Sequence, residues 1–294
     1  MSVPLVSFHG GQGKGAINNV VAFTAGGGTY DLLSTATPSG VVHPLKELRK
    51  FLFDPVAHNL YVANGSKELN QVLRFSPPVE SGRQWRYEGV FAAKNLAHPF
   101  DVVFGFAGDL FVSSQDKSWV TRHPLQGAGG DVFAAGFESV RGLAFDGNHL
   151  YVADSQAGRV CRYDQGGEEL DHVKVSKPVH LLYEPARRWL LIGSEADDSV
   201  LAWSPAKPSD PPTKVVSGAK AAIDHTAGLA LLPKSAATAA LYVASRVGRQ
   251  VLSFPLDFSS GRPVWTPTTR TVVLHEKQLS DEPEFVGIES GLYG

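Results

Sequence analysis

The sequence predicts an all-β protein built from a repeated unit, because one short pattern recurs six times. Each copy joins an apolar run, ending in a small or polar residue, to a second short run that usually begins with Val or Trp. Equivalent aromatic or apolar positions fall at 61, 111, 151, 191 and 242, at intervals of 50, 40, 40 and 51 residues. Units of about 40–50 residues that hold several short strands are typical of β-propellers. The copies lie at residues 5–8 with 20–23, 60–64 with 72–75, 110–114 with 119–122, 150–154 with 160–163, 190–194 with 200–203, and 241–245 with 251–254.

One unit shows how four antiparallel strands are expected to form a blade. Residues 141–145 give the inner strand, and Asp146-Gly147-Asn148 gives a hairpin turn, since Asp-Gly pairs tolerate positive φ. Residues 150–153 and 159–163 follow as the next strands, and the outer strand falls near 170–175. Val, Leu and aromatic residues fill these runs and no helical period is sustained, which favours strands throughout.

The other units repeat this order. Their inner strands are expected at 49–53, 100–104, 179–183, 227–231 and 284–288. These runs are nearly continuously apolar, as expected for strands covered on both faces by neighbouring blades. Outer strands are expected at 30–33, 87–91, 131–134, 214–217 and 271–274, and residues 235–240 should form a hairpin tip.

The two ends of the chain are expected to complete each other. The N-terminal segment lacks an inner strand, and residues 283–288 form an inner strand with no blade after it. One blade that combines N- and C-terminal strands would close the ring and remove open sheet edges. The sequence therefore predicts a single six-bladed β-propeller domain over residues 1–294. The blades are numbered from one to six in chain order, and the closing blade is blade one.

Composition narrows the classes of function. The 27 basic and 29 acidic residues give a net charge of −2, which argues against general nucleic-acid binding, although a local basic patch stays open. No apolar run approaches the roughly 18 residues that span a bilayer, and the first residues lack signal-peptide features. The single Cys161 allows no intramolecular disulfide and is expected to be buried. We expect a cytoplasmic protein that binds neither membrane nor nucleic acid, with its oligomeric state open.

The segment 140–160, which includes the run VRGLAFDGNHLYVADS, resembles an NHL repeat. It is also similar to blades of the six-bladed superfamily that contains SMP-30/gluconolactonase and strictosidine-synthase-like proteins. That resemblance implies the fold and, more weakly, small-molecule chemistry. Residues 98–102 are similar to the blade pattern of virginiamycin-lyase-like proteins.

The resemblance also implies where a metal would bind. The hydrolases carry Asn or Asp where inner strands begin, and the zinc lyases carry three His there. The six equivalent positions here are Arg49, Phe100, Arg141, Val179, Ala227 and Glu284. Arg141 stands where a metal-binding Asn is expected, and arginines disfavour a cation site. We therefore predict no metal and no cofactor. The strictosidine-synthase-like group needs no metal and has a glutamate in its closing blade. The resemblance therefore implies that Glu284 has the role of that glutamate.

The candidate site is the face where the inner strands begin, because ligands usually bind there at the channel mouth. Candidate ligand-binding residues are Arg49, His98, Phe100, Asp101, Arg141 and His180, and candidate catalytic residues are Glu284 and His225. Two arginines could hold a carboxylate or phosphate, or instead form ion pairs between blades. The histidines could move protons, but their offsets from the inner strands differ, so capping and packing roles stay open.

The sequence thus predicts a metal-independent enzyme or binder for a small organic ligand, of lyase, cyclase or hydrolase type. The alternative is a non-catalytic NHL-type scaffold that binds a protein or glycan. No GxSxG, HExxH or CxxC motif decides between them.

Overall fold

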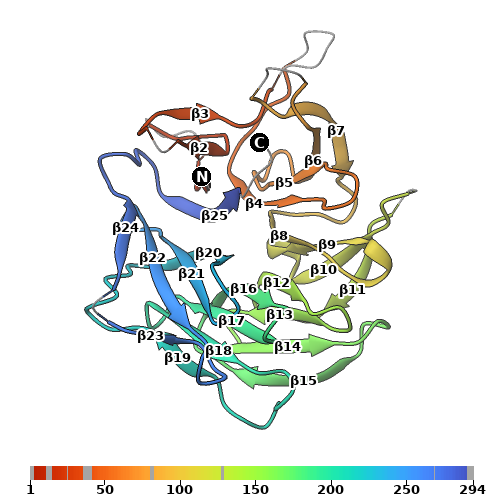
Figure 1. Ribbon diagram of the computed structural model, residues 1–294. Coiled ribbons are helices and arrows are strands. Elements are labelled where there is room, and N and C mark those ends of the chain that lie inside the picture. The colour runs from red at the N-terminus through yellow and green to blue at the C-terminus, as the bar shows by residue number, and fades with distance from the viewer. Residues whose placement is uncertain are drawn as a thin grey trace.

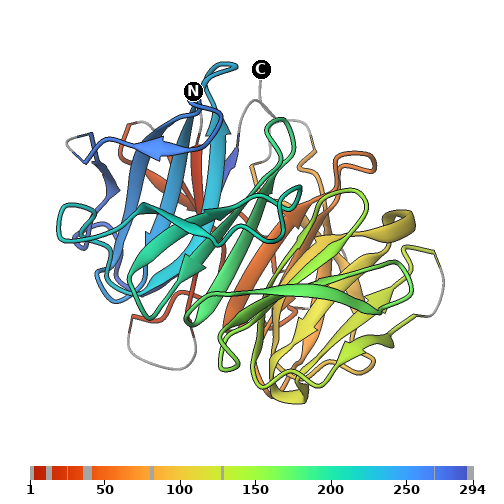
Figure 2. The same cartoon turned by 90° about the horizontal axis from the view of Figure 1, so that it is seen from below.

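The described residues form six antiparallel sheets arranged as blades around a central axis (Figure 1). The computed structural model describes residues 3–10, 15–24, 26–35, 42–79, 83–126, 129–267 and 269–289. Within these residues five blades contain four strands and the sixth contains five, with the inner strand of each blade at the axis. Figure 2 shows the blades from a second side, with the strands of each blade lying side by side. This arrangement confirms the six-bladed propeller.

The strand bounds follow the predicted order in every blade. Blades one to three contain β25 (Pro283–Glu289), β1 (Val3–Phe8), β2 (Val21–Phe23) and β3 (Thr29–Asp31); β4 (Leu48–Phe53), β5 (Leu60–Asn64), β6 (Gln71–Ser76) and β7 (Arg86–Ala92); and β8 (Pro99–Phe104), β9 (Leu110–Ser114), β10 (Trp119–His123) and β11 (Asp131–Ala135). Blades four to six contain β12 (Val140–Phe145), β13 (Leu150–Asp154), β14 (Arg159–Tyr163) and β15 (Glu169–Lys174); β16 (Pro178–Glu184), β17 (Trp189–Ser194), β18 (Ser199–Trp203) and β19 (Thr213–Val216); and β20 (Thr226–Pro233), β21 (Thr238–Ser245), β22 (Gln250–Asp257) and β24 (Thr271–Leu274).

Blade six differs from the predicted four strands. A fifth strand, β23 (Val264–Trp265), pairs with the far end of β22, where Leu256 is opposite Trp265. The hairpin of β20 and β21 is also longer than expected, because Leu232 pairs with Ala240 and Pro233 with Ala239. Residues 238–240, predicted as part of a hairpin tip, therefore belong to a strand.

The closing blade forms as predicted. β25 pairs antiparallel with β1 from Val3 opposite Glu289 to Phe8 opposite Pro283. The inner strands contact one another around the ring in the order β25, β4, β8, β12, β16, β20 and back to β25. The C-terminal strand therefore joins the first blade to the last.

The cores lie between neighbouring blades. One cluster joins Phe111 and Val120 of blade three to Leu143 and Val152 of blade four, and the other clusters repeat this arrangement around the ring. Cys161 is buried in the same cluster, as expected, and burial raises the pKa of its thiol to about 12. The two short helical turns, Phe106–Gly108 and Gln115–Lys117, lie in blade three. None of the helices among the described residues is long and apolar enough to cross a membrane.

Two glycines allow the inner strands to approach closely. A Cβ added at Gly228 of β20 would lie 2.5 Å from Phe285 Cα and 2.7 Å from Val286 N, both backbone atoms of β25. A Cβ at Gly142 of β12 would lie 2.7 Å from the carbonyl oxygen of Val179. Since backbone cannot rotate aside as a side chain can, larger residues would force the blades apart.

Gly228→Ala is expected to lower the free energy of unfolding by about 1–3 kcal/mol, the usual cost of adding a methyl group to a well-packed core. Urea unfolding of the variant and of the wild type measures the loss. Gly26→Ala is the matched control, because Gly26 is exposed and its added Cβ would meet no heavy atom within 4 Å. Equal stability of Gly228→Ala and Gly26→Ala would contradict this packing.

Candidate functional site

The upper face of the propeller is where the inner strands begin and where the loops between second and third strands lie. A register shift follows the first residues of the inner strand in blades two to six. Such bulges interrupt the alternation of side chains and re-aim them. Two successive residues of β4 can therefore face the axis, with Arg49 at the upper mouth and Lys50 lining a cavity below it.

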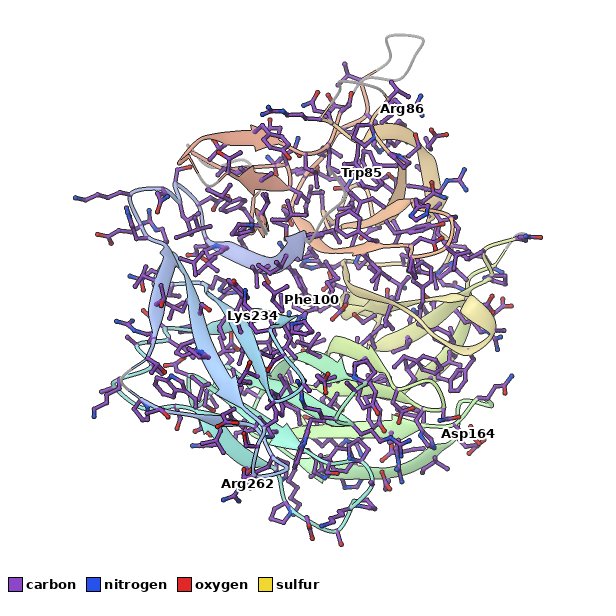
Figure 3. The ribbon with its side chains drawn as sticks, in the orientation of Figure 1. Trp85, Arg86, Phe100, Asp164, Lys234 and Arg262 are labelled. Atoms are coloured by element: carbon purple, nitrogen blue, oxygen red, sulfur yellow. The ribbon has the colours of Figure 1, made fainter. Side chains whose placement is uncertain are left out.

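The second residues of the six inner strands form a ring across this mouth, as the sequence predicts. The ring is filled by its own side chains, since all of its members are buried except the half-buried Arg141. Figure 3 shows Phe100, one of these residues, near the centre of the molecule. A ligand on this face would rest on the ring and contact the loop residues above it. The ring consists of Arg49, Phe100, Arg141, Val179, Ala227 and Glu284.

Glu284 and His9 form a pair at the mouth. Glu284 Oε2 lies 3.2 Å from His9 Nδ1, and the side-chain exposures are 5% for Glu284 and 48% for His9. Burial alone would raise the pKa of Glu284, but the hydrogen bond from His9 and the charges of Arg49 and Arg246 lower it to about 2. Because an ionised carboxylate only accepts hydrogen bonds, His9 Nδ1 carries the proton. In neutral His9, Nε2 is then the nitrogen that can accept a proton.

Arg49 holds this pair in place from below. Its Nη1 donates to the carbonyl oxygen of His9 at 3.0 Å, and its Nη2 lies 3.2 Å from His98 Nε2. Burial and then the charge of Arg49 lower the pKa of His98, which suits a neutral ring that accepts from the guanidinium. Arg49 is itself buried, so its guanidinium positions His9 and His98 within the mouth.

Arg141 is the more accessible of the two predicted arginines. Its Nη1 donates to Gln115 Oε1 at 2.6 Å, and its guanidinium lies over the Phe100 ring, 5.2 Å from the centroid. Burial lowers the pKa of Arg141, and the negative charges of Glu284 and Glu195 oppose that effect. Among the described residues, the hydrogen-bond partner of Arg141 is the neutral amide of Gln115. The other N–H groups of the guanidinium can therefore donate to an anion.

Arg246 adds a third guanidinium from the loop after β21. Arg246 Nε lies 3.5 Å from Glu282 Oε2, and Arg246 Nη2 lies 3.8 Å from Glu195 Oε1. These ion pairs join the loops of blades five and six to the segment before β25. The mouth therefore combines arginines with carboxylates that partly neutralise them.

Asp101 and His180, predicted as ligand-binding residues, lie one residue further along their strands and face each other below the ring. Asp101 Oδ2 is 3.9 Å from His180 Nδ1, and Lys50 Nζ approaches both residues, at 3.5 Å from Asp101 Oδ1 and 3.3 Å from His180 Nε2. They form a second cluster with Lys50, separate from the Glu284 and His9 pair.

His225 lies on the loop before β20. Its Nδ1 is 3.2 Å from Asp224 Oδ1, and its backbone N–H donates to Asp198 Oδ1 at 2.8 Å. His225 precedes its inner strand, as His98 does, whereas His180 lies within one. The unequal offsets noted in the sequence thus place the three histidines in different surroundings. Among the described residues, no group of three or more His, Cys, Asp or Glu is arranged to hold a metal ion.

Sequence reasoning missed His9 and Lys50. His9 directly follows β1, and its backbone N–H donates to the carbonyl oxygen of Glu282, which brings it beside β25. The predicted closure of the first blade was a signal for this neighbourhood. Lys50 had no such signal, because regular strand alternation would turn it away from the side that Arg49 faces.

No family model matches the chain, and no curated protein matches its sequence. Solved structures match its fold. A chain in the crystal structure of a nidogen/laminin complex has a TM-score of 0.69 at 13% identity, over 98% of both chains. A putative 6-phosphogluconolactonase from Bacteroides uniformis has a TM-score of 0.67 at 14% identity, over 98% of this chain and 99% of that one. The periplasmic gluconolactonase of Pseudomonas aeruginosa has a TM-score of 0.67 at 16% identity, over 92% and 83%. At these identities the matches show the shared propeller fold.

Proposed function

We propose that the protein binds a small anionic organic molecule at the upper mouth and hydrolyses it without a metal. The observation that carries this proposal is the pair of buried Glu284 and half-exposed His9, which faces Arg141 across the mouth. A buried carboxylate that orients an accessible imidazole is a common arrangement for general base catalysis. The guanidinium of Arg141 supplies a charge-assisted contact for an anion, and the arginines disfavour a divalent cation at the same place.

Each residue has a defined part in the proposed reaction. His9 Nε2 accepts a proton from water as the water oxygen attacks the carbonyl carbon of a lactone. The ring C–O bond then breaks, and the leaving oxygen takes the proton back from the imidazolium. Glu284 is a positioning residue in this scheme, because a pKa of about 2 makes it a poor proton donor at neutral pH.

A phosphorylated sugar lactone is the substrate class that this scheme favours. Its phosphate matches the guanidinium of Arg141, and its ester carbon is open to attack by activated water. Two of the fold neighbours are described as a putative 6-phosphogluconolactonase and a periplasmic gluconolactonase, which supports the choice.

The test is proton release during hydrolysis of 6-phosphoglucono-δ-lactone, measured against the buffer rate. We expect the wild type to exceed the buffer rate and His9→Ala to lose about 100-fold or more of kcat. Arg141→Met should raise KM for the phosphorylated lactone and leave KM for glucono-δ-lactone unchanged. The matched controls are His172→Ala and Arg188→Met, whose side chains are exposed on the outer strand β15 and in the hairpin between β16 and β17.

One observation favours a second candidate, a scaffold that binds a protein or glycan on its upper face. The ring of inner-strand residues is filled, so a partner would meet a broad surface there. The fold neighbour in the nidogen/laminin structure belongs to a protein complex. A wild-type rate equal to buffer for both lactones would refute the hydrolase proposal and favour this one.

A further inference from the structure

A cavity of about 400 Å³ lies in the lower half of the central channel, on the opposite side of the ring from His9 and Glu284. All six inner strands line it, with apolar side chains that include Phe53, Leu231 and Ile288. Its volume falls within the roughly 300–1,000 Å³ of small-molecule sites. The walls alone therefore suit an apolar ligand.

Lys50 gives this cavity a single charge. Of the described residues that line the cavity, Lys50 alone has a charged side chain, and that side chain is 18% exposed. Within the described part of the chain, Lys50 Nζ has two polar partners, His180 Nε2 and Asp101 Oδ1. An ammonium group has three N–H donors, so one donor stays available to a ligand.

The surroundings of Lys50 hold its ammonium group at this position. The group lies 5.5 Å from the centroid of the Phe285 ring, a cation–π contact. Burial lowers the pKa of His180 far below its usual value, so its neutral ring can accept a hydrogen bond from Lys50. Burial also raises the pKa of Asp101, while the charge of Lys50 and the backbone hydrogen bond from Leu143 act in the opposite direction.

Among the described residues, two buried polar atoms beside Lys50 lack hydrogen bonds, since the contact of 3.5 Å between Lys50 Nζ and Asp101 Oδ1 is an ion pair. They are Asp101 Oδ1 and His180 Nδ1, and both residues are at most 1% exposed. Unsatisfied buried polar atoms are rare in proteins and call for a specific explanation. Asp101 and His180 do not line the cavity, so a ligand would reach this cluster through Lys50.

We propose that the lower channel binds a monocarboxylate with an apolar body. The carboxylate pairs with Lys50, and the body packs against the inner strands between Phe53, Leu231 and Ile288. This site is independent of the proposed hydrolysis, because the filled ring separates the cavity from the upper mouth.

Calorimetric titration of the full chain with decanoate tests the proposal, with decan-1-ol and decyltrimethylammonium as ligands of equal chain length. We expect decanoate to bind at least about tenfold more tightly than either of them, as a charge-assisted contact requires. Equal affinity for the three head groups, or no binding of decanoate, would overturn the proposal with the wild-type chain alone.

Two variants then locate the ligand. Lys50→Met keeps the length of the side chain and should weaken decanoate about tenfold or more, while the affinity for decan-1-ol stays the same. Arg141→Met should leave decanoate binding unchanged, because Arg141 belongs to the ring and does not line the lower cavity. Unchanged decanoate affinity in Lys50→Met, or its loss in Arg141→Met, would refute the lower site. Thermal melting confirms that each variant is folded before titration.

Discussion

A chain that ends at Glu282 is expected to aggregate, because it lacks the whole of β25. This strand is the inner strand of blade one, where it pairs with β1 and contacts both β20 and β4. It also supplies Phe285, which is 1% exposed. Losing one buried Phe costs about 3–5 kcal/mol, a large part of the roughly 5–15 kcal/mol that stabilises a typical domain. The open ring and the unpaired edge of β1 would then favour association between chains.

The soluble fraction and the size-exclusion profile measure this effect. A chain that ends at Glu289 is the control, since it keeps all of β25. A soluble, monomeric chain ending at Glu282, with the melting temperature of the full chain, would show that β25 does not close the ring.

The fold could be predicted from the sequence because each blade repeats the same local signals. The turn at Asp146 and Gly147, between an apolar inner strand and the next strand, is a direct example. The closure of the ring could also be predicted, because the N-terminal segment lacks an inner strand and the C-terminal segment supplies one. The short strand β23 and the longer hairpin in blade six could not be predicted, because pairing at Trp265 and Ala240 depends on where β22 and β20 continue in space.

The candidate site was predictable in position and less so in contacts. The six residues expected to begin the inner strands, Arg141 and Glu284 among them, lie one residue inside the strands at the same end of the ring. Blade one is next to blade two and opposite blade four, so Glu284 is a neighbour of Arg49 and faces Arg141 across the mouth. The filling of the ring depends on side-chain packing among six blades, which no single repeat encodes. The bulge that turns Lys50 toward the axis is also invisible in its local sequence.

Replacing Glu284 by Gln is expected to lower the free energy of unfolding by about 3 kcal/mol at pH 7. The pKa of Glu284 falls from a usual value of 4.5 to about 2 in the folded protein. Each pKa unit corresponds to about 1.4 kcal/mol. A carboxyl with a depressed pKa stabilises the fold above its unfolded pKa, and this contribution is lost as pH falls from about 4.5 toward 2. Glutamine keeps the shape of the side chain but removes the negative charge that faces Arg49 and Arg246.

Urea unfolding of wild type and variant at pH 7 and pH 3 separates charge from packing. The difference between the two proteins should shrink at pH 3 to less than half of its value at pH 7, because part of the contribution of Glu284 is then already lost in the wild type. Glu276→Gln, at an exposed position in the turn after β24, should change stability by less than about 0.5 kcal/mol at both pH values. If Glu284→Gln costs the same at pH 7 and pH 3, its effect arises from packing or hydrogen bonding. Glu284 would then not be the buried carboxylate that orients His9, and the proposed proton transfer at the upper mouth would lose its basis.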